Sequence, residues 1–351
     1  MANSPLGVGL IGLGSIGRTH AQVLREFPGD FALRCFSGGS VDAAATAGWP
    51  DAVQLPPDAV PNHPEVELVL ICSPSGDHPT RALYALEAGR HVVVEKPFAV
   101  NGVDADRVLR RAAARDRWIA TIAQRRFEPV SIAVKSLLEQ GMLGTLRMAN
   151  VRVHWWRGAD YYAAASWRGS MADGGGSAMN QGFHAIDLLR WLCGEVESVT
   201  AQYGTLAHDI EAEDVTAATV RFGNGALGLI GTSTATPPGD PASITLWFDR
   251  GVVELGDNMI TRWDIEGVPE PGTESPVDGT ADRPRITSGA ADPSAIGLAG
   301  HLAQWQAIAT AVRDGTTPPV PASDAAGTVR LLDAIYRAAR TGRATRPEES
   351  R

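Results

Sequence analysis

The chain has 351 residues, 44% of them hydrophobic and 20% charged, and its 31 basic and 40 acidic side chains give a formal net charge of −9. This composition is typical of a folded globular protein with room for two domains, and it excludes a disordered chain. The apolar runs are too short to span a bilayer, and an acidic chain without a basic cluster repels phosphate backbones. We therefore expect a small-molecule ligand, no membrane span and no nucleic acid.

The cysteines and the N-terminal residues indicate a reducing compartment. Cys35, Cys72 and Cys193 are far apart, odd in number and without the spacing of a zinc site. The first residues carry no basic segment of the kind that precedes the apolar stretch of a secretory signal. We therefore expect a cytoplasmic protein with no disulfide framework and no metal.

Short apolar runs alternate with helical segments over residues 1–125. Strands are predicted at 6–11, 31–36, 68–72, 91–95 and 118–123, and helices after the glycine-rich turn at 12–17 and over 79–88. This alternation favours right-handed parallel crossovers. We predict an α/β fold whose first domain, residues 1–125, is a Rossmann-type, doubly wound parallel sheet.

The pattern changes after residue 125. A helix is predicted at 129–140 and another from the glycine run at 174–176 to about residue 192, and strands at 146–155, 196–203, 215–222, 226–233, 243–248 and 252–255. Asn224-Gly225 between two of these strands is a hairpin signal. We assign residues 126–351 to a second α/β domain with a large, open, mostly antiparallel sheet.

Residues 264–300 are rich in Pro, Gly, Ser and Asp and show little periodicity. That length is unusual for a structureless loop in a compact domain, so we expect a lid, an intersubunit arm or an element that the pattern hides. Two helices are predicted after it, at 301–313 and 323–341, the second capped by Ser323 and ended by Gly342.

The turn Gly12-Leu13-Gly14-Ser15-Ile16-Gly17 follows a strand and precedes a helix, the context in which a GxGxxG motif binds a dinucleotide. Gly12 allows the tight turn, Gly14 lets the backbone approach a pyrophosphate, and Gly17 lets the helix pack closely on the strand. The helix N-terminus, with Ser15 and Ile16, supplies free amides and a positive dipole end. The alternative is a plain strand-to-helix turn.

Ser37 stands at the end of the second strand, where an acidic residue would hold the ribose hydroxyls of NAD. Without that carboxylate a ribose phosphate is not repelled, and Arg34 is close in sequence. The pattern leans slightly to NADP over NAD. In the alternative interpretation Ser37 is only a turn residue.

Lys96 is one of only two lysines, the other being Lys135, among 31 basic residues. It lies in Glu95-Lys96-Pro97, directly after a predicted buried strand, and ligands bind at the carboxyl ends of strands in doubly wound sheets. A lysine ammonium is a compact donor whose pKa shifts on desolvation, whereas arginine stays charged. We interpret Lys96 as a site residue, with a solvated surface lysine as the alternative.

A third motif follows the glycine run at 174–176. On one helix, Asn180 and His184 would share a face, and Asp187 would lie one turn beyond. His184 could then act as a base beside an amide that binds a hydroxyl. A structural histidine is the alternative, and we interpret Asp187 as a capping or ion-pairing residue.

The order and spacing of GLGSIG, EKP at 95–97 and GGG before the His184 helix resemble the Gfo/Idh/MocA family of nicotinamide-dependent oxidoreductases, with support from Ser73-Pro74 and His78. The resemblance is dense from about residue 6 to 195 and looser to about 342. It implies a Rossmann domain, a second domain with a large sheet, and hydride transfer to or from a sugar or cyclitol. It also implies homodimers or homotetramers formed through that sheet.

In this resemblance His184 takes the hydroxyl proton, Lys96 binds the reacting oxygen, and Ser73, Pro74, His78 and Glu95 lie at the cofactor. Many members have aspartate where this chain has Asn180, and an amide orients a hydroxyl instead of acting as a base. That departure favours a pyranoside or nucleotide sugar over inositol.

Four further side chains are candidates for substrate binding: Arg126, Tyr162, Trp167 and Arg168. Flat rings suit sugar faces, and arginines suit carboxylates or phosphates. The alternatives are interdomain packing for the rings and an ion pair with Glu128 for Arg126.

We therefore predict an NAD(P)-dependent sugar oxidoreductase. One alternative is a glycoside-cleaving enzyme on the same fold, in which transient oxidation by bound NAD precedes elimination. Another is a non-catalytic relative that senses a dinucleotide or binds a partner, and such a protein would not need both Lys96 and His184.

Overall fold

The computed structural model describes residues 4–256, 258–272 and 298–348. Most of the 264–300 segment, for which a lid or an arm was predicted, lies outside these residues. Among the described helices, none is both long enough and apolar enough to cross a membrane.

Six short strands form the first sheet, in the order β3-β2-β1-β4-β5-β6, and every neighbouring pair is parallel. The strands are β1 Leu6–Ile11, β2 Phe31–Ser37, β3 Val53–Gln54, β4 Leu68–Ile71, β5 His91–Val94 and β6 Ile119–Thr121. The connecting helices are α1 Ser15–Leu24, α2 Val41–Thr46, α3 His78–Glu87 and α4 Gly102–Arg115. The predicted doubly wound sheet is confirmed, although α2, α4 and the short β3 were not predicted.

Seven strands form the second sheet, in the order β13-β12-β11-β7-β10-β9-β8. They are β7 Leu146–His154, β8 Val196–Gly204, β9 Val215–Phe222, β10 Leu227–Ser233, β11 Ser243–Phe248, β12 Gly251–Gly256 and β13 Met259–Ile265. All neighbours are antiparallel except β7 and β10, which run parallel. The mostly antiparallel sheet and the hairpin at Asn224-Gly225 are confirmed, and β13 is an element that the pattern missed.

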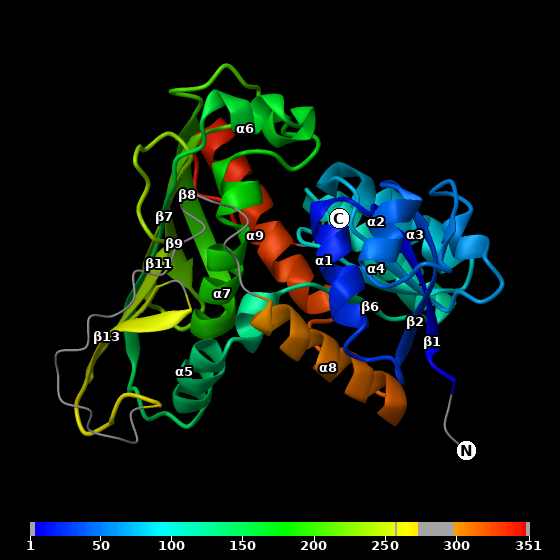
Figure 1. The fold of residues 1–351 in the computed structure, drawn as a ribbon. Helices are drawn as coiled ribbons and strands as arrows, with labels where there is room; N and C mark the ends of the chain where they lie inside the picture. Colours follow the sequence, from blue (N-terminus) through cyan, green and yellow to red (C-terminus); the bar gives the residue numbers. More distant parts are fainter. Residues whose placement is uncertain (1–3, 257, 273–297, 349–351) are drawn as a thin grey trace.

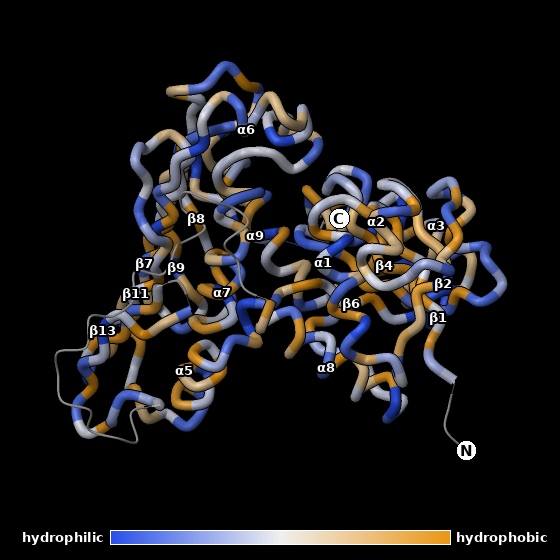
Figure 2. Tube along the Cα trace, viewed as in Figure 1, coloured by the Kyte–Doolittle hydropathy of each residue, from blue (hydrophilic) through white to orange (hydrophobic). Residues whose placement is uncertain are grey.

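Helices cover one face of the second sheet. α7 Phe183–Cys193 and α9 Ala322–Thr341 lie between this sheet and the first one, and α5 Pro129–Glu139 and α6 Ala159–Ala163 lie near its two ends (Figure 1). Apolar side chains of α7 and α9, such as Ile186 and Leu332, share one core with the sheet. The hydropathy colouring shows the hydrophobic residues of these helices among those of the strands (Figure 2).

The last two helices also stabilise the first sheet, although they follow the second sheet in the chain. α8 Ala299–Asp314 places Trp305 and Ile308 in one core with Phe31, and the beginning of α9 places Val329 in the core around Val94. The boundary at residues 125 and 126 stays a prediction, and the apolar core of the first sheet includes these later residues.

The predicted ends of α9 have different outcomes. The helix begins at Ala322 after Pro321, so Ser323 lies inside the first turn and the predicted Ser323 cap is wrong. Proline fixes the backbone just before the helix, and this suffices to start it. Gly342 ends the helix in the left-handed conformation with φ of +64°, as predicted.

Candidate active site

Three loops meet at the carboxyl ends of β1, β4 and β5: the glycine-rich turn, the Ser73-Pro74 turn, and Glu95-Lys96-Pro97. The segment that precedes α7 packs against this edge, since a Cβ atom on Gly174 would contact Ser75 at 2.9 Å. Lys96 Nζ donates a hydrogen bond to the backbone oxygen of Asn180 at 3.1 Å. Motifs that are 84 residues apart in sequence therefore contact each other.

The glycine-rich turn has the geometry of a dinucleotide cradle. Gly12 has φ of +99°, and a Cβ there would lie 2.6 Å from the Cys72 carbonyl. A Cβ on Gly17 would lie 2.1 Å from the Gly12 oxygen, so only glycine lets α1 pack this closely. A Cβ on Gly14 would meet no atom within 4 Å. Gly14 therefore leaves open space at the N-terminus of α1, where Ser15 and Ile16 begin the helix without a side-chain cap, and a pyrophosphate fits there.

The open space at Gly14 makes a prediction for Gly14→Val. The variant should fold with a melting temperature lowered only slightly by valine at the N-cap of α1, because the added Cβ atom meets no protein atom within 4 Å. It should bind NADH at least about tenfold more weakly, because the side chain extends into the space assigned to the pyrophosphate. Fluorescence titration and a thermal melt measure both effects. Gly17→Val is the contrast, since its side chain collides with the Gly12 oxygen and should lower stability. Unchanged NADH binding by Gly14→Val would contradict the cradle.

The end of β2 is tied to the cradle, because the Ser37 carbonyl accepts hydrogen bonds from the backbone amides of Gly12 and Leu13 at 3.0 and 2.9 Å. Ser37 itself is buried. Arg34, considered above as a partner for a ribose phosphate, pairs with Glu65 at 3.7 Å instead. The structure thus gives the predicted NADP preference no support from Arg34.

His78 and Glu95 form hydrogen bonds within the loops that follow β4 and β5. Both ring nitrogens of buried His78 contact backbone oxygens, Nε2 that of Ser73 at 2.8 Å and Nδ1 that of Pro97 at 2.7 Å. Glu95 is also buried, and its two oxygens contact His20 Nε2 and accept the Lys96 amide. A direct contact of these side chains with the cofactor stays a prediction. The buried hydroxyl of Ser73 has no hydrogen-bond partner among the described residues, so it is available to a cofactor.

His184 and Lys96 influence each other electrostatically. Burial lowers the pKa of His184 well below its usual range, and the positive charges of Lys96 and Arg125 lower it further. Burial also lowers the pKa of Lys96, an effect that Glu95 opposes and Arg125 reinforces. His184 is therefore a neutral imidazole that can accept a proton beside a lysine that can donate one.

The predicted arrangement, with Asn180 and His184 on one face of a single α-helix, is not found. Residues Ser177–Gln181 form a π-helical turn, and α7 begins only at Phe183. Gly182 lies between the two segments, and glycine is required there because a Cβ atom would lie 2.6 Å from Thr232. Lys96 contacts the first of these segments through the Asn180 carbonyl.

Tyr161, the neighbour of Tyr162 in the aromatic segment before the glycine run, contacts the amide side chains of the turn. Its hydroxyl oxygen accepts hydrogen bonds from Gln181 Nε2 at 2.6 Å and from Asn180 Nδ2 at 3.2 Å. Gln181 Oε1 accepts from Arg157 at 3.1 Å, and this contact fixes the amide orientation because a guanidinium only donates. With both lone pairs of Tyr161 engaged, its O–H proton is left to donate elsewhere.

Of the predicted substrate residues, Arg168 lies on the Tyr161 ring, Trp167 lies beside Arg168, and Tyr162 packs edge-on against the Tyr161 ring at 5.1 Å. The Arg168 guanidinium lies 4.2 Å from the centre of the Tyr161 ring and 5.7 Å from that of Trp167, and it donates to the Tyr161 carbonyl at 2.7 Å. Tyr162 bonds to the Thr234 hydroxyl at 2.8 Å, and its ring lies against His208.

Arg126 belongs to a buried ion-pair network, which corrects its assignment to substrate binding. Its guanidinium donates to both Asp187 oxygens, at 2.6 and 2.7 Å, and also pairs with Asp324 at the beginning of α9. Its side chain is only 5% exposed. The expected ion-pairing role of Asp187 is confirmed, and the network ties α7 to α9 behind the site.

Glu213 positions the turn that carries Asn180. Its carboxylate accepts the backbone amides of Ser177 and Ala178 at 2.7 and 2.8 Å, and also the Tyr336 hydroxyl at 3.0 Å. Burial raises its pKa to about 7 against these hydrogen bonds. Its only sequence signal is an acidic residue before a strand, which indicates no partner.

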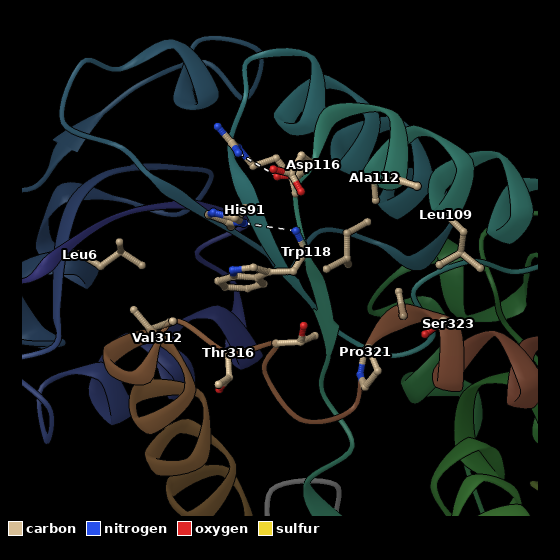
Figure 3. A pocket seen from close by; sticks show the side chains of 16 residues that line it. Leu6, His91, Leu109, Ala112, Asp116, Trp118, Val312, Thr316, Pro321 and Ser323 are labelled. Atoms are coloured by element: carbon tan, nitrogen blue, oxygen red, sulfur yellow. Dashed lines mark hydrogen bonds between the residues drawn. The ribbon is translucent and has the colours of Figure 1, made fainter.

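A cavity of about 660 Å³ lies elsewhere, beside residues at the amino ends of the strands (Figure 3). Leu6 and His91 begin their strands there, and the His91 ring stacks on Trp118 at 4.5 Å. Ligands of doubly wound sheets bind at the opposite, carboxyl ends. We therefore do not assign this cavity to the reaction.

Comparisons with known proteins agree with the motifs. Residues 6–122 match an oxidoreductase family with an NAD-binding Rossmann fold, and residues 132–254 match a GFO/IDH/MocA C-terminal domain. The chain is 30% identical to the WlbA dehydrogenase of Bordetella pertussis, solved with NADH and UDP-GlcNAcA, with a TM-score of 0.85 over 97% of this chain and 98% of that one. It is 28% identical to WlbA of Chromobacterium violaceum, solved with the same two molecules, with a TM-score of 0.87 over 100% and 98%.

A curated relative, the scyllo-inositol 2-dehydrogenase (NADP(+)) IolW of Bacillus subtilis, is 24% identical over 96% of this chain and 94% of its own length. The two matched regions cover the two sheets in the expected order. The chain therefore belongs to the Gfo/Idh/MocA family of nicotinamide-dependent oxidoreductases.

Proposed function

We propose that this oxidoreductase transfers a hydride between the nicotinamide and a secondary hydroxyl or carbonyl of a sugar, either a pyranoside or a nucleotide sugar. The observation that carries the proposal is the hydrogen bond of Lys96 Nζ to the Asn180 carbonyl, since it joins the cofactor-binding loops to the segment before His184. Proton donor, base and hydroxyl-orienting groups then lie at one place, as alcohol oxidation requires.

A nicotinamide cofactor held here would supply the hydride chemistry, and the chain supplies alignment and proton transfer. In the oxidation direction the neutral imidazole of His184 takes the hydroxyl proton. Lys96 donates a hydrogen bond to the same oxygen and stabilises the negative charge that develops on it. Gly12, Gly14, Ser15, Ile16 and Gly17 would hold the pyrophosphate, with Ser73 and Pro74 beside it.

A sugar with an anionic group fits the wall beside this pair. Tyr161 has a free O–H proton, and Arg168 lies on its ring, so the wall offers a hydroxyl donor next to a positive charge. A guanidinium binds carboxylate or phosphate through paired donors. The nucleotide sugar bound by the WlbA relatives, UDP-GlcNAcA, has this chemistry.

The choice between NAD and NADP rests on Ser37. We keep the slight preference for NADP as a proposal, because no carboxylate side chain stands at that position to repel a ribose phosphate. Arg34 is engaged with Glu65, so any preference for NADP comes from the lack of repulsion.

Titration of the purified protein with NADH and NADPH tests the proposal, after absorbance and mass spectrometry for cofactor that co-purifies. Selective binding should be followed by turnover in a screen of pyranosides and nucleotide sugars. Release of an aglycone without net reduction of the cofactor would instead support glycoside cleavage. Binding of neither cofactor, with none retained, would favour a non-catalytic relative.

We also propose a homodimer or homotetramer formed through the open face of the second sheet. Met148, Leu227 and Leu229 lie on neighbouring strands and are 37%, 50% and 41% exposed, so this face presents apolar side chains to solvent. Light scattering should give two or four times the 37.1 kDa chain mass. Leu229→Arg should lower that mass, and a monomeric mass for the unaltered protein would reject the proposal.

A further inference from the structure

A buried hydrogen-bonded chain lies directly behind Lys96, and the mechanism above does not use it. Trp305 Nε1 on α8 donates to His20 Nδ1 on α1 at 2.9 Å. His20 Nε2 lies 2.7 Å from Glu95 Oε1, and Glu95 Oε2 accepts the Lys96 backbone amide at 2.9 Å. Trp305 and His20 are fully buried and Glu95 is 6% exposed. These hydrogen bonds thus join α8 and α1, the helix that follows the glycine-rich turn, to the loop of Lys96.

The donors and acceptors in this chain fix the tautomer of His20. An indole N–H can only donate, so His20 Nδ1 must present a lone pair to Trp305. The single ring proton of His20 is then on Nε2, where it is donated to Glu95. His20 is therefore neutral, and Glu95 is an ionised carboxylate that accepts from both sides. Burial alone would raise the pKa of Glu95, and the hydrogen bond from His20 opposes this rise.

A metal ion does not fit this cluster as well as the hydrogen-bonded chain does. The ligand atoms of His20, Glu95 and His301 lie within 4.8 Å of one another. A metal bound through His20 Nε2 would move the ring proton to Nδ1, where it would face the indole N–H of Trp305. His301 packs its ring edge on His20 at 5.2 Å, and burial lowers its pKa to about 4, so it adds no positive charge near neutral pH.

We propose that Trp305 and His20 are positioning residues that keep an uncompensated negative charge on Glu95 beneath Lys96. If His20 carried a second proton, its imidazolium would neutralise the carboxylate. Trp305 prevents this by occupying Nδ1 with a donor. The charge on Glu95 then favours the protonated ammonium of Lys96, which burial and the positive charge of Arg125 disfavour. The inference deepens the proposed function, because it rests on Lys96 as the proton donor.

The first test observes His20 in the unaltered protein. Its ring nitrogens, observed by 15N NMR among the eight histidines and assigned with His20→Gln, should keep the neutral Nε2–H pattern from about pH 9 to about pH 6. A doubly protonated His20 ring in this range would overturn the proposal. This measurement requires no substitution of Trp305, so it decides the matter even where Trp305 variants fail to fold.

The second test measures Lys96 directly. Because the chain has two lysines, 13Cε-lysine labelling gives two signals, and Lys135 serves as the internal reference. Trp305→Phe frees His20 Nδ1 to take a proton, so the titration midpoint of Lys96 should fall by about half a pH unit or more while that of Lys135 stays unchanged.

His20→Gln is the matched control, because an amide can donate to Glu95 and accept from Trp305 but does not titrate. Lys96 should titrate in His20→Gln as in the unaltered protein, and adding Trp305→Phe to that variant should produce no further shift. If Trp305→Phe shifts the titration midpoint of Lys96 equally with His20 and with His20→Gln, Trp305 acts only by packing and the proposal is overturned. If Trp305→Phe causes no shift with His20 present, the proposal is overturned as well.

These readouts do not require activity. If Lys96 titrates as expected in every variant but no sugar or nucleotide sugar is turned over, the proposed function fails and the role of Trp305 and His20 stands. If turnover is found but Trp305→Phe, in the protein that retains His20, does not change the titration midpoint of Lys96, only the positioning role fails.

Discussion

His184→Ala should lower kcat for sugar oxidation by about 10²–10⁴-fold, the contribution typical of a positioned general base. The imidazole is neutral at ordinary pH because burial and the charges of Lys96 and Arg125 depress its pKa well below the usual range. It can therefore accept the hydroxyl proton without first losing one. The affinity for NADH should stay nearly unchanged, since the cradle is formed by the glycine-rich turn and the loops after β4 and β5.

Steady-state turnover and NADH titration of the same preparation separate the two effects. His63→Ala, in the loop before β4 at the amino end of the first sheet, is the control for loss of a histidine and should keep full activity. Unchanged turnover in His184→Ala would remove His184 from the mechanism. A parallel loss of NADH affinity would indicate instead that the site had collapsed.

The local part of the site could be predicted from the sequence because its signals are short-range. The roles of Gly12, Gly14 and Gly17 follow from three positions in one turn, and the structure gives each the expected surroundings. The position of Lys96 follows from a strand that ends directly before it. Such inferences need only strand polarity and the geometry of one turn.

The incorrect predictions concern residues whose contacts are made by segments far away in the sequence. Arg126 was placed at the substrate because its partners, Asp187 and Asp324, lie 61 and 198 residues away. Tyr161 and Tyr162 are equivalent in a linear pattern, and only the fold places Gln181 beside one and Thr234 beside the other. A π-helical turn in place of an α-helix is likewise set by Glu213, which holds its first amides from 36 residues downstream.

The last two helices show the same limit. Their apolar stripes predict helices, and both are found, but the pattern does not tell which sheet they cover. From the sequence alone, Trp305 is predicted to be one of many core residues, and His20 a polar residue on an amphipathic helix. Their shared hydrogen bond spans 285 residues, so the buried chain behind Lys96 was beyond reach of the sequence.

Lys96→Arg should lose about 10²–10³-fold in kcat although it keeps the positive charge. The Lys96 ammonium is compact, donates to the Asn180 carbonyl at 3.1 Å, and has a pKa that burial lowers, so it can share its proton with a reacting oxygen. A guanidinium is larger and planar, holds its proton across the working pH range, and would displace Asn180 or the substrate. The loss should appear in kcat, with NADH affinity retained.

Lys135→Arg is the matched control because Lys135 is the other lysine of the chain and lies on α5, where it donates to the Trp191 carbonyl at 2.9 Å and pairs with Glu139 at 3.5 Å. An arginine can make both contacts, so full activity is expected. If Lys96→Arg were also fully active, position 96 would need only a positive charge, and proton donation would have to come from Tyr161. Because the free O–H of Tyr161 is the other donor that the structure places beside Asn180, Tyr161→Phe in the Lys96→Arg background would then abolish turnover.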